Sequence, residues 1–122
     1  MVGPAALAEQ LHVTLNRKGV ILVGAKTYEK FGRPDCVVLL FDQINSLIGI
    51  SPSNRFTANA YPLLTKGANR YRIINANKFC RHFGVMTDRT IAFYDVKVDE
   101  GGMMVLDLNK ARGIGKSVAK SA

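Results

Sequence analysis

The chain has 122 residues, of which 48% are hydrophobic, and its formal net charge is +8. This length and composition fit a single globular domain with a core of its own. No apolar run approaches the roughly 20 residues of a membrane-spanning helix, and the first residues lack the pattern of a signal peptide. We therefore expect a cytoplasmic protein with no membrane partner, in which Cys36 and Cys80 are reduced, buried thiols.

Two stretches of the chain, 18–32 and 70–84, are similar to each other without a gap. They share four identical aligned pairs, which are Ile21 with Ile73, Lys26 with Lys78, Phe31 with Phe83, and Gly32 with Gly84. Each copy reads as a basic residue, an aliphatic strand, a small residue, a short amphipathic helix and Phe-Gly. A divergent internal repeat explains this order. Within one domain, 1–122, we expect repeat one at 12–51, a linker at 52–62, repeat two at 63–108 and a basic, disordered tail at 109–122.

The first repeat is expected to contain strands 12–16 and 21–23, helix 25–31 and a hairpin of strands 37–41 and 47–50. The helix follows from the spacing of Ala25, Tyr28 and Phe31, which would face the core together, and Gly32 would end it. The apolar run over 37–41 is typical of a strand that is covered on both faces. The residues between the two hairpin strands predict a turn.

The second repeat is expected to contain strand 72–75, helix 77–83 and a longer hairpin of strands 90–98 and 103–108, preceded by a short strand near 61–64. Gly84 would end this helix as Gly32 ends the first. The alignment predicts that Phe31 and Phe83 are equivalent, buried anchors of the core. After Asp107 no packing pattern remains, which indicates a disordered tail.

Acidic and basic residues are distributed unevenly along the chain. No acidic residue lies between Asp42 and Asp88, a second acid-free stretch runs from Gln10 to Tyr28, and a third follows Asp107. Such one-sided patterning raises the local positive potential and favours polyanions such as nucleic acid. The alternative is an ordinary solvated face on a basic protein.

The candidate nucleic-acid-binding residues are the cations of the aligned turns and helices, namely Arg17, Lys18, Lys26, Lys30, Arg70, Arg72, Lys78 and Arg81. Like charges four apart cost an isolated helix about 0.2 to 0.5 kcal/mol, so a repeated cationic stripe is unfavourable unless an anion meets it. Exposed lysines on helices are also common without any such role. The turn cations are the better candidates because they occur in both copies. In the alternative reading, Arg70 and Arg72 cover apolar surface and pair with Asp95 or Asp107.

Nothing in the sequence predicts an enzyme, a cofactor or a metal site. The segment 113–117 resembles a phosphate-binding loop only in part, because that motif needs a glycine where Lys110 stands. Cys80 and His82 are two apart on an expected helix and so point away from each other. The carboxylates fall at strand ends and turns, where they favour turn chemistry.

The order LNRKGVILVGAKTYEKFG resembles the swapped-hairpin module of the AbrB/SpoVT family of prokaryotic transcription regulators. In that family a strand, a Gly-Arg turn, a short strand ending in Ile-Pro, a short helix ending in Leu-Gly and a hairpin recur. The residues that match are Gly19 in the first turn, Arg72 in the second copy, and Phe31-Gly32 and Phe83-Gly84 at the helix ends. Neither copy has the complete Gly-Arg pair. Val20 stands in place of the arginine in the first copy, and Tyr71 stands in place of the glycine in the second. Two modules in one chain are similar to the MraZ branch, although its Asp-x-x-x-Arg signature is absent.

This resemblance implies a mainly β fold with short helices, in which two swapped-hairpin repeats interlock into a pseudo-twofold β-barrel. The protein would be a pseudo-dimeric monomer or a homodimer. It would be a non-catalytic transcriptional regulator that binds DNA, most simply duplex DNA. Two alternatives remain, a protein-interaction or assembly module like that of antitoxins with this barrel, and an RNA-binding protein.

Overall fold

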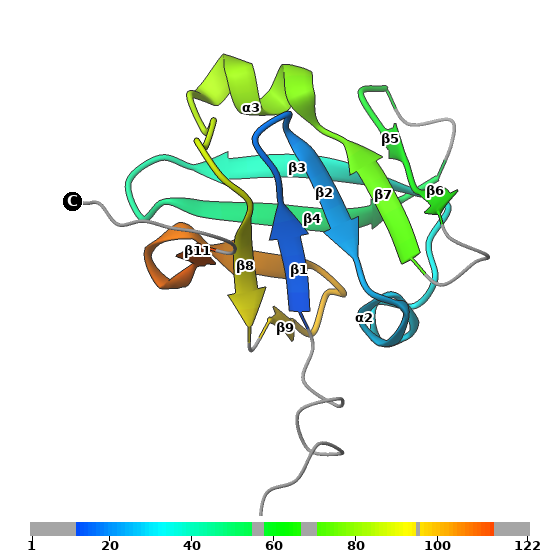
Figure 1. Cartoon of the computed structure of the whole chain (residues 1–122). Helices are drawn as coiled ribbons and strands as arrows, with labels where there is room; N and C mark the ends of the chain where they lie inside the picture. The colour runs from blue at the N-terminus through cyan, green and yellow to red at the C-terminus, as the bar shows by residue number, and fades with distance from the viewer. Residues whose placement is uncertain (1–11, 55–57, 67–70, 95, 114–122) are drawn as a thin grey trace, which may run out of the picture.

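The computed structural model describes residues 12–54, 58–66, 71–94 and 96–113, which form two antiparallel sheets and short helices (Figure 1). The six-stranded sheet has the order β11 (Arg112–Gly113), β8 (Ile91–Tyr94), β1 (His12–Leu15), β2 (Val20–Val23), β7 (Tyr71–Asn75), β6 (Leu64–Lys66). The five-stranded sheet has the order β5 (Tyr61–Pro62), β3 (Cys36–Asp42), β4 (Leu47–Ser53), β10 (Met104–Asp107), β9 (Lys97–Val98). The helices are α2 (Ala25–Lys30), α3 (Asn77–Phe83) and the 3-10 helix η1 (Leu108–Lys110). The expected mainly β fold is confirmed.

The core is built from alternate residues of the strands, because successive side chains of a strand point to opposite faces. In β1 and β2 the fully buried residues are Val13, Leu15, Ile21 and Val23. Their counterparts in the five-stranded sheet are Val37, Ile48, Ile50, Met104 and Leu106. Each such aliphatic side chain contributes roughly 1.5 to 3 kcal/mol on burial. The alternation read from the sequence therefore sets which face of each sheet is covered.

The two Phe-Gly pairs end their helices with the same backbone hydrogen bonds. After α2, Gly32 N–H donates to Glu29 O (3.1 Å) and Arg33 N–H donates to Tyr28 O (3.1 Å). After α3, Gly84 N–H donates to Arg81 O (3.4 Å) and Val85 N–H donates to Cys80 O (2.7 Å). This pair of bonds is the Schellman motif, and both glycines have the positive φ that it needs, 93° and 70°. The predicted helix-stopping role of both glycines is confirmed.

The paired strands of the two sheets do not close into one barrel over the residues that the structure describes. Several chain segments instead pass from one sheet to the other, among them 104–113, which holds β10 in one sheet and β11 in the other. The segment 61–66 holds β5 in one sheet and β6 in the other, and 91–98 likewise holds β8 and β9. The expected continuous hairpin of 90–98 with 103–108 is therefore wrong. Of the residues expected in its first strand, β9 pairs with β10, whereas β8 pairs with β1. Phe93 in β8 and Val96 just before β9 are both buried.

The expected linker and tail both contain regular structure. Strand β4 extends to Ser53 and β5 begins at Tyr61, so the linker 52–62 is strand at both ends, while 55–57 lie outside the described residues. The tail was expected to be disordered from residue 109, but η1 runs to Lys110 and β11 pairs with β8. Asp107 explains the first of these, because its side chain accepts a hydrogen bond from Asn109 N–H (2.9 Å). Residues 114–122 lie outside the described part of the chain.

Two expectations about burial are wrong. In β3, Leu40 is 49% exposed, so this strand is not covered on both faces. Phe31 is buried with 4% exposure, whereas Phe83 is 42% exposed, so the two are not equivalent anchors. The reason lies one helical turn earlier, where Phe79 is buried at the position that aligns with the smaller Thr27. Phe79 fills the core beneath α3, and Phe83 is left at the surface.

Candidate nucleic-acid interface

The turn between β1 and β2 carries Arg17 and Lys18, and hydrogen bonds fix its backbone. The Asn16 side chain accepts from Lys18 N–H (2.9 Å) and from Val20 N–H (3.0 Å). Gly19 completes the turn with a φ of 78°, a conformation that glycine adopts without strain. Because the turn is fixed by its own residues, the exposed side chains of Arg17 and Lys18 leave it from a defined position.

The same turn is joined to the start of α3 by contacts that are distant in sequence. Asn77 Nδ2 donates to Lys18 O (2.9 Å), and Ala76 N–H donates to Gly19 O (2.9 Å). A Cβ on Gly19 would lie 2.7 Å from Asn77 Cα, so only glycine allows this close approach. The turn and the helix therefore form one unit.

This unit presents a cluster of four exposed cations, Arg17 and Lys18 from the turn and Lys78 and Arg81 from α3, which we call the turn–α3 patch. All four come from acid-free stretches of the sequence. Within the described residues the ion pairs are Arg33 with Glu29 and Arg89 with Asp88. None of the four cations of the patch takes part in them. Their charges are therefore directed to solvent.

Three other candidate cations, Lys26, Lys30 and Arg72, lie at the opposite end of β2 and β7. Val20 pairs with Asn75 beside the turn–α3 patch, and Val23 pairs with Arg72 near α2, which carries Lys26 and Lys30 (Figure 1). Here the Arg72 guanidinium stacks over the Tyr28 ring, 4.4 Å from its centroid. This stacking fits the alternative in which Arg72 covers apolar surface. Arg70 lies outside the described residues.

A groove beside α3 was not foreseen from the sequence. It has a volume of about 660 Å³, and the lining side chains include Asn59, Tyr61, Lys78, Phe79, His82 and Phe83. These residues come from α3 and from the segment 59–61, with β3 along one side, so no local pattern reveals the groove. The only sequence signal is the aromatic pair Phe79 and Phe83, four apart, with Arg81 and His82 between them. We call this hollow the α3 groove.

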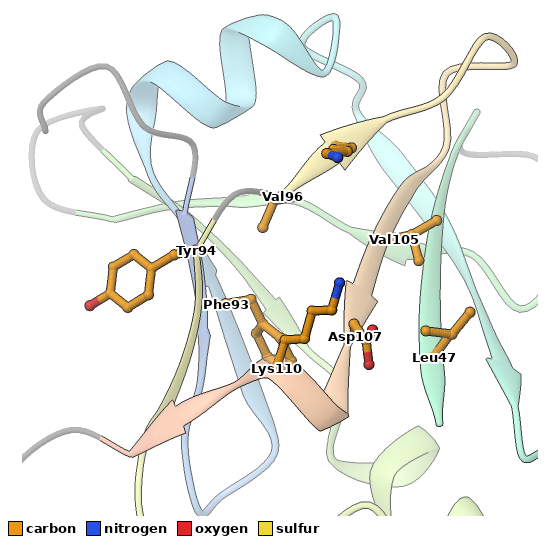
Figure 2. A pocket seen from close by; sticks show the side chains of 8 residues that line it. Leu47, Phe93, Tyr94, Val96, Val105, Asp107 and Lys110 are labelled. Atoms are coloured by element: carbon orange, nitrogen blue, oxygen red, sulfur yellow. The ribbon is translucent and has the colours of Figure 1, made fainter. Parts of the chain in front are cut away.

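A second hollow lies where β8 and η1 approach β4 and β10 (Figure 2). Its volume is about 200 Å³, below the roughly 300 to 1,000 Å³ of small-molecule sites. Figure 2 shows Tyr94 directed away from Phe93, Lys110 and Asp107. Asp107 already holds the N-terminus of η1 by accepting from Asn109 N–H. This hollow is therefore smaller than a typical site for an organic ligand.

In the described part of the chain, the pKa values of Cys80 and Asp42 depart from their ordinary values. Cys36 and Cys80 are free and buried, as expected, and burial raises the pKa of the Cys80 thiol, which disfavours a reactive thiolate. The hydrogen bond from the Asn45 amide lowers the pKa of Asp42, so this turn carboxylate stays ionised. Among the described residues no group of His, Cys, Asp and Glu could hold a metal ion, and no helix is long and apolar enough to cross a membrane.

The structure thus brings four of the eight predicted residues together in the turn–α3 patch. It places Lys26, Lys30 and Arg72 at the other end of β2 and β7. The groove beside the patch is the feature that sequence reasoning missed. Comparison of the chain with protein-family models, with curated proteins and with solved structures finds no match.

Proposed function

We propose that this protein is a non-catalytic DNA-binding regulator that holds phosphates on the turn–α3 patch. The observation that supports this most directly is the fixed turn. Exposed side chains of Arg17 and Lys18 stand on a backbone that Asn77 ties to α3, beside Lys78 and Arg81. Binding then costs less ordering of the backbone than it would on a flexible loop.

Phosphate contacts explain affinity and orientation in such a complex, and they do not read sequence. Arginine can hold a phosphate through two parallel hydrogen bonds, whereas lysine acts as a point charge. The patch contains both kinds. The regulatory role rests on the resemblance to the AbrB/SpoVT module, in which the turn after the first strand is a recurring part of the pattern.

The finer proposal on the fold is that the two repeats form a pseudo-twofold barrel within one chain. The register of β2 with β7 supports it, because Ile21 pairs with Ile74 and Leu22 pairs with Ile73. Ile21 aligns with Ile73 and Leu22 with Ile74, so exchanging the two repeats reproduces the same two pairs. The matching helix ends are a second support. Since one chain supplies both halves, we expect a monomer by sedimentation, and an obligate dimer would contradict this.

A protein-interaction module is the second candidate, and one surface favours it. The outer face of the five-stranded sheet has an apolar hollow of about 220 Å³, lined by Leu40, Leu47, Gly49, Met103 and Val105 among others. Exposed apolar patches mark surfaces where partner proteins bind. This face is separate from the turn–α3 patch, so a partner there would not compete with nucleic acid.

A binding panel tests the proposed function. Fluorescence anisotropy would be measured with duplex DNA, single-stranded DNA and structured RNA, each at several salt concentrations. We expect affinity for duplex DNA to fall linearly with salt on a double logarithmic plot, as counterion release requires. Tighter binding to structured RNA than to duplex DNA would favour the RNA-binding alternative. If no nucleic acid shows salt-dependent binding, the proposal fails and the protein-interaction module becomes the better account.

A further inference from the structure

We propose that the α3 groove binds an unpaired nucleobase of a strand whose phosphates lie on the turn–α3 patch. This inference rests on the proposed function and names a more specific ligand for the same end of the molecule. The ligand would be single-stranded nucleic acid, or a duplex with a looped-out or terminal base. Three observations support it, namely an exposed and fixed aromatic ring, the charges around the groove, and a lysine that the groove shares with the patch.

The aromatic ring is that of Phe83, which is 42% exposed in the groove wall. Three other rings hold it in place, since the ring centroids of Phe41, Phe79 and His82 lie 5.2, 5.0 and 4.6 Å from that of Phe83. An exposed phenylalanine normally loses side-chain freedom when a ligand binds. Here neighbouring rings have already ordered it, so its exposed part is a preformed surface for stacking a base.

The charges around the groove favour a polyanion over an apolar peptide. Among the residues that the structure describes, no carboxylate lines the groove. Its polar lining groups include the Lys78 ammonium, the His82 imidazole and the Asn59 amide, and the amide can both donate and accept hydrogen bonds at a base edge. Asn59 has a φ of 66°, a left-handed conformation that asparagine adopts more readily than most residues.

Lys78 connects the groove to the patch, because it belongs to both. A phosphate on Lys78 would place the attached nucleotide at the mouth of the groove. A base inside an intact duplex is stacked between its neighbours, and removing it from the stack costs a few kcal/mol. An unpaired base has no such cost. The groove therefore selects strands with an accessible base, whereas the patch alone binds any phosphate backbone.

The test compares two short single strands of DNA that differ at one position. One strand carries a fluorescent adenine analogue and the other an abasic site, so both have the same phosphates. We expect the base-containing strand to bind about tenfold more tightly, which corresponds to about 1.4 kcal/mol and lies within the usual range for stacking one base. The analogue should also change its fluorescence on binding. Equal affinities for the two strands would overturn the proposal.

Variants identify the ring that is responsible. Phe83→Ala and Phe83→Leu should both lose the preference for the base. The leucine variant keeps an apolar side chain at this position, so it remains informative if the alanine variant folds poorly. Phe83→Tyr should keep the preference. Tyr71→Ala is the matched control, because Tyr71 is equally exposed at 41% but lies at the other end of β7. If Phe83→Leu retains the full preference, or Tyr71→Ala loses it, the groove is not the base site.

The outcomes separate this inference from the proposed function. If both strands bind equally and with the expected salt dependence, the groove proposal fails while the phosphate-binding patch stands. If neither strand nor duplex DNA binds, both proposals fail. Binding of an apolar peptide that Phe83→Leu weakens, without any preference for the base, would assign the groove to a protein partner and would also overturn the proposal.

Discussion

The two ends of the β2–β7 pair come from aligned stretches of the sequence, and among the residues that the structure describes a turn is tied to a helix at the α3 end alone. At the α3 end, Gly19 allows the close approach of Asn77, whose side chain binds the main chain of Lys18. The aligned positions at the α2 end are Tyr71 and Ala25, and neither can play the same part. The difference teaches that two aligned stretches can keep the same helix end while the contact between turn and helix depends on the residues at two positions, Gly19 and Asn77.

The helices differ in the same way. Both end in the same Schellman motif, but Phe31 is buried beside α2 while Phe83 is exposed on α3. At the α2 end, Arg72 is engaged by the Tyr28 ring, and Tyr28 in turn donates a hydrogen bond to Pro34 O (2.9 Å). At the α2 end Phe31 and the Arg72–Tyr28 pair take part in packing, whereas at the α3 end Phe83 is left exposed beside the cations of the turn–α3 patch.

The largest effect should come from the two phenylalanines. Phe31→Ala should lower the free energy of unfolding by about 3 to 5 kcal/mol, because it leaves a cavity in the core. Phe83→Ala should lower it by roughly 1 to 2 kcal/mol, since much of that ring is exposed and its main contacts are with other rings. Urea unfolding monitored by circular dichroism measures both. Equal losses would mean that the two ends are equivalent after all.

The glycines sharpen the comparison. Gly19→Ala should destabilise the protein by about 1 to 3 kcal/mol, since alanine must accept a positive φ and its Cβ would meet Asn77. Gly32→Ala is the matched control, because it has the same kind of φ and nothing within 4 Å of the added Cβ. The control should lose only about 1 kcal/mol. A control loss as large as that of Gly19→Ala would show that the close approach is unimportant.

Asn77 should have a smaller effect on stability and a separate effect on binding. Asn77→Ala removes the hydrogen bond to Lys18 O and should cost about 0.5 to 1.5 kcal/mol in chemical denaturation. It should also weaken binding to DNA without changing any charge, because the turn is no longer tied to α3. Asn75→Ala, an exposed asparagine at the end of β7, should change neither quantity. If Asn77→Ala binds DNA with unaltered affinity, the link between turn and α3 does not contribute to DNA binding.

The smallest effect concerns Cys80, which is fully buried under α3 where the first repeat has the half-buried Tyr28. Burial raises the pKa of the thiol in the folded state above the ordinary value of 9.0. Folding thus favours the neutral thiol. Its contribution to the free energy of unfolding is fully present below pH 9 and is lost as the pH rises through the folded-state pKa. Stability should therefore fall above pH 9, and the fall should be shallower in Cys80→Ala. An identical alkaline pH profile in the variant would contradict this.

Local patterns predicted the local structure well. The predicted helix 77–83 agrees with α3, which Gly84 ends as expected. The turn after β3 follows from Asp42, which accepts from Ile44 and Asn45 N–H. Features that depend on distant segments were missed. The segment 91–98 is divided between two sheets because β8 pairs with β1 and β9 pairs with β10. Strand β11 forms by pairing with β8, which is distant in sequence.

The same reason explains how much of the candidate site could be predicted. Charge patterning identified Arg17, Lys18, Lys78 and Arg81, but it did not show that Asn77 joins the turn to the helix across the fold. The α3 groove is formed by three separate segments, so no spacing in the sequence encodes it. The alignment of Phe31 with Phe83 predicted equal burial and failed, because Phe79 replaces the smaller Thr27 beneath the helix.

The central claim is that one end of the molecule holds the phosphates. It is tested by comparing the fourfold variant Arg17→Gln, Lys18→Gln, Lys78→Gln, Arg81→Gln with a control of the same charge, Arg33→Gln, Lys97→Gln, Lys110→Gln, Arg112→Gln, whose cations are also exposed. The measurement is the slope of log affinity for duplex DNA against log salt. The patch variant should reduce the magnitude of this slope by about 0.9 for each phosphate that it no longer binds, and the control should leave the slope unchanged. Equal reductions in the two variants would show that net charge alone attracts DNA, and would contradict a specific turn–α3 interface.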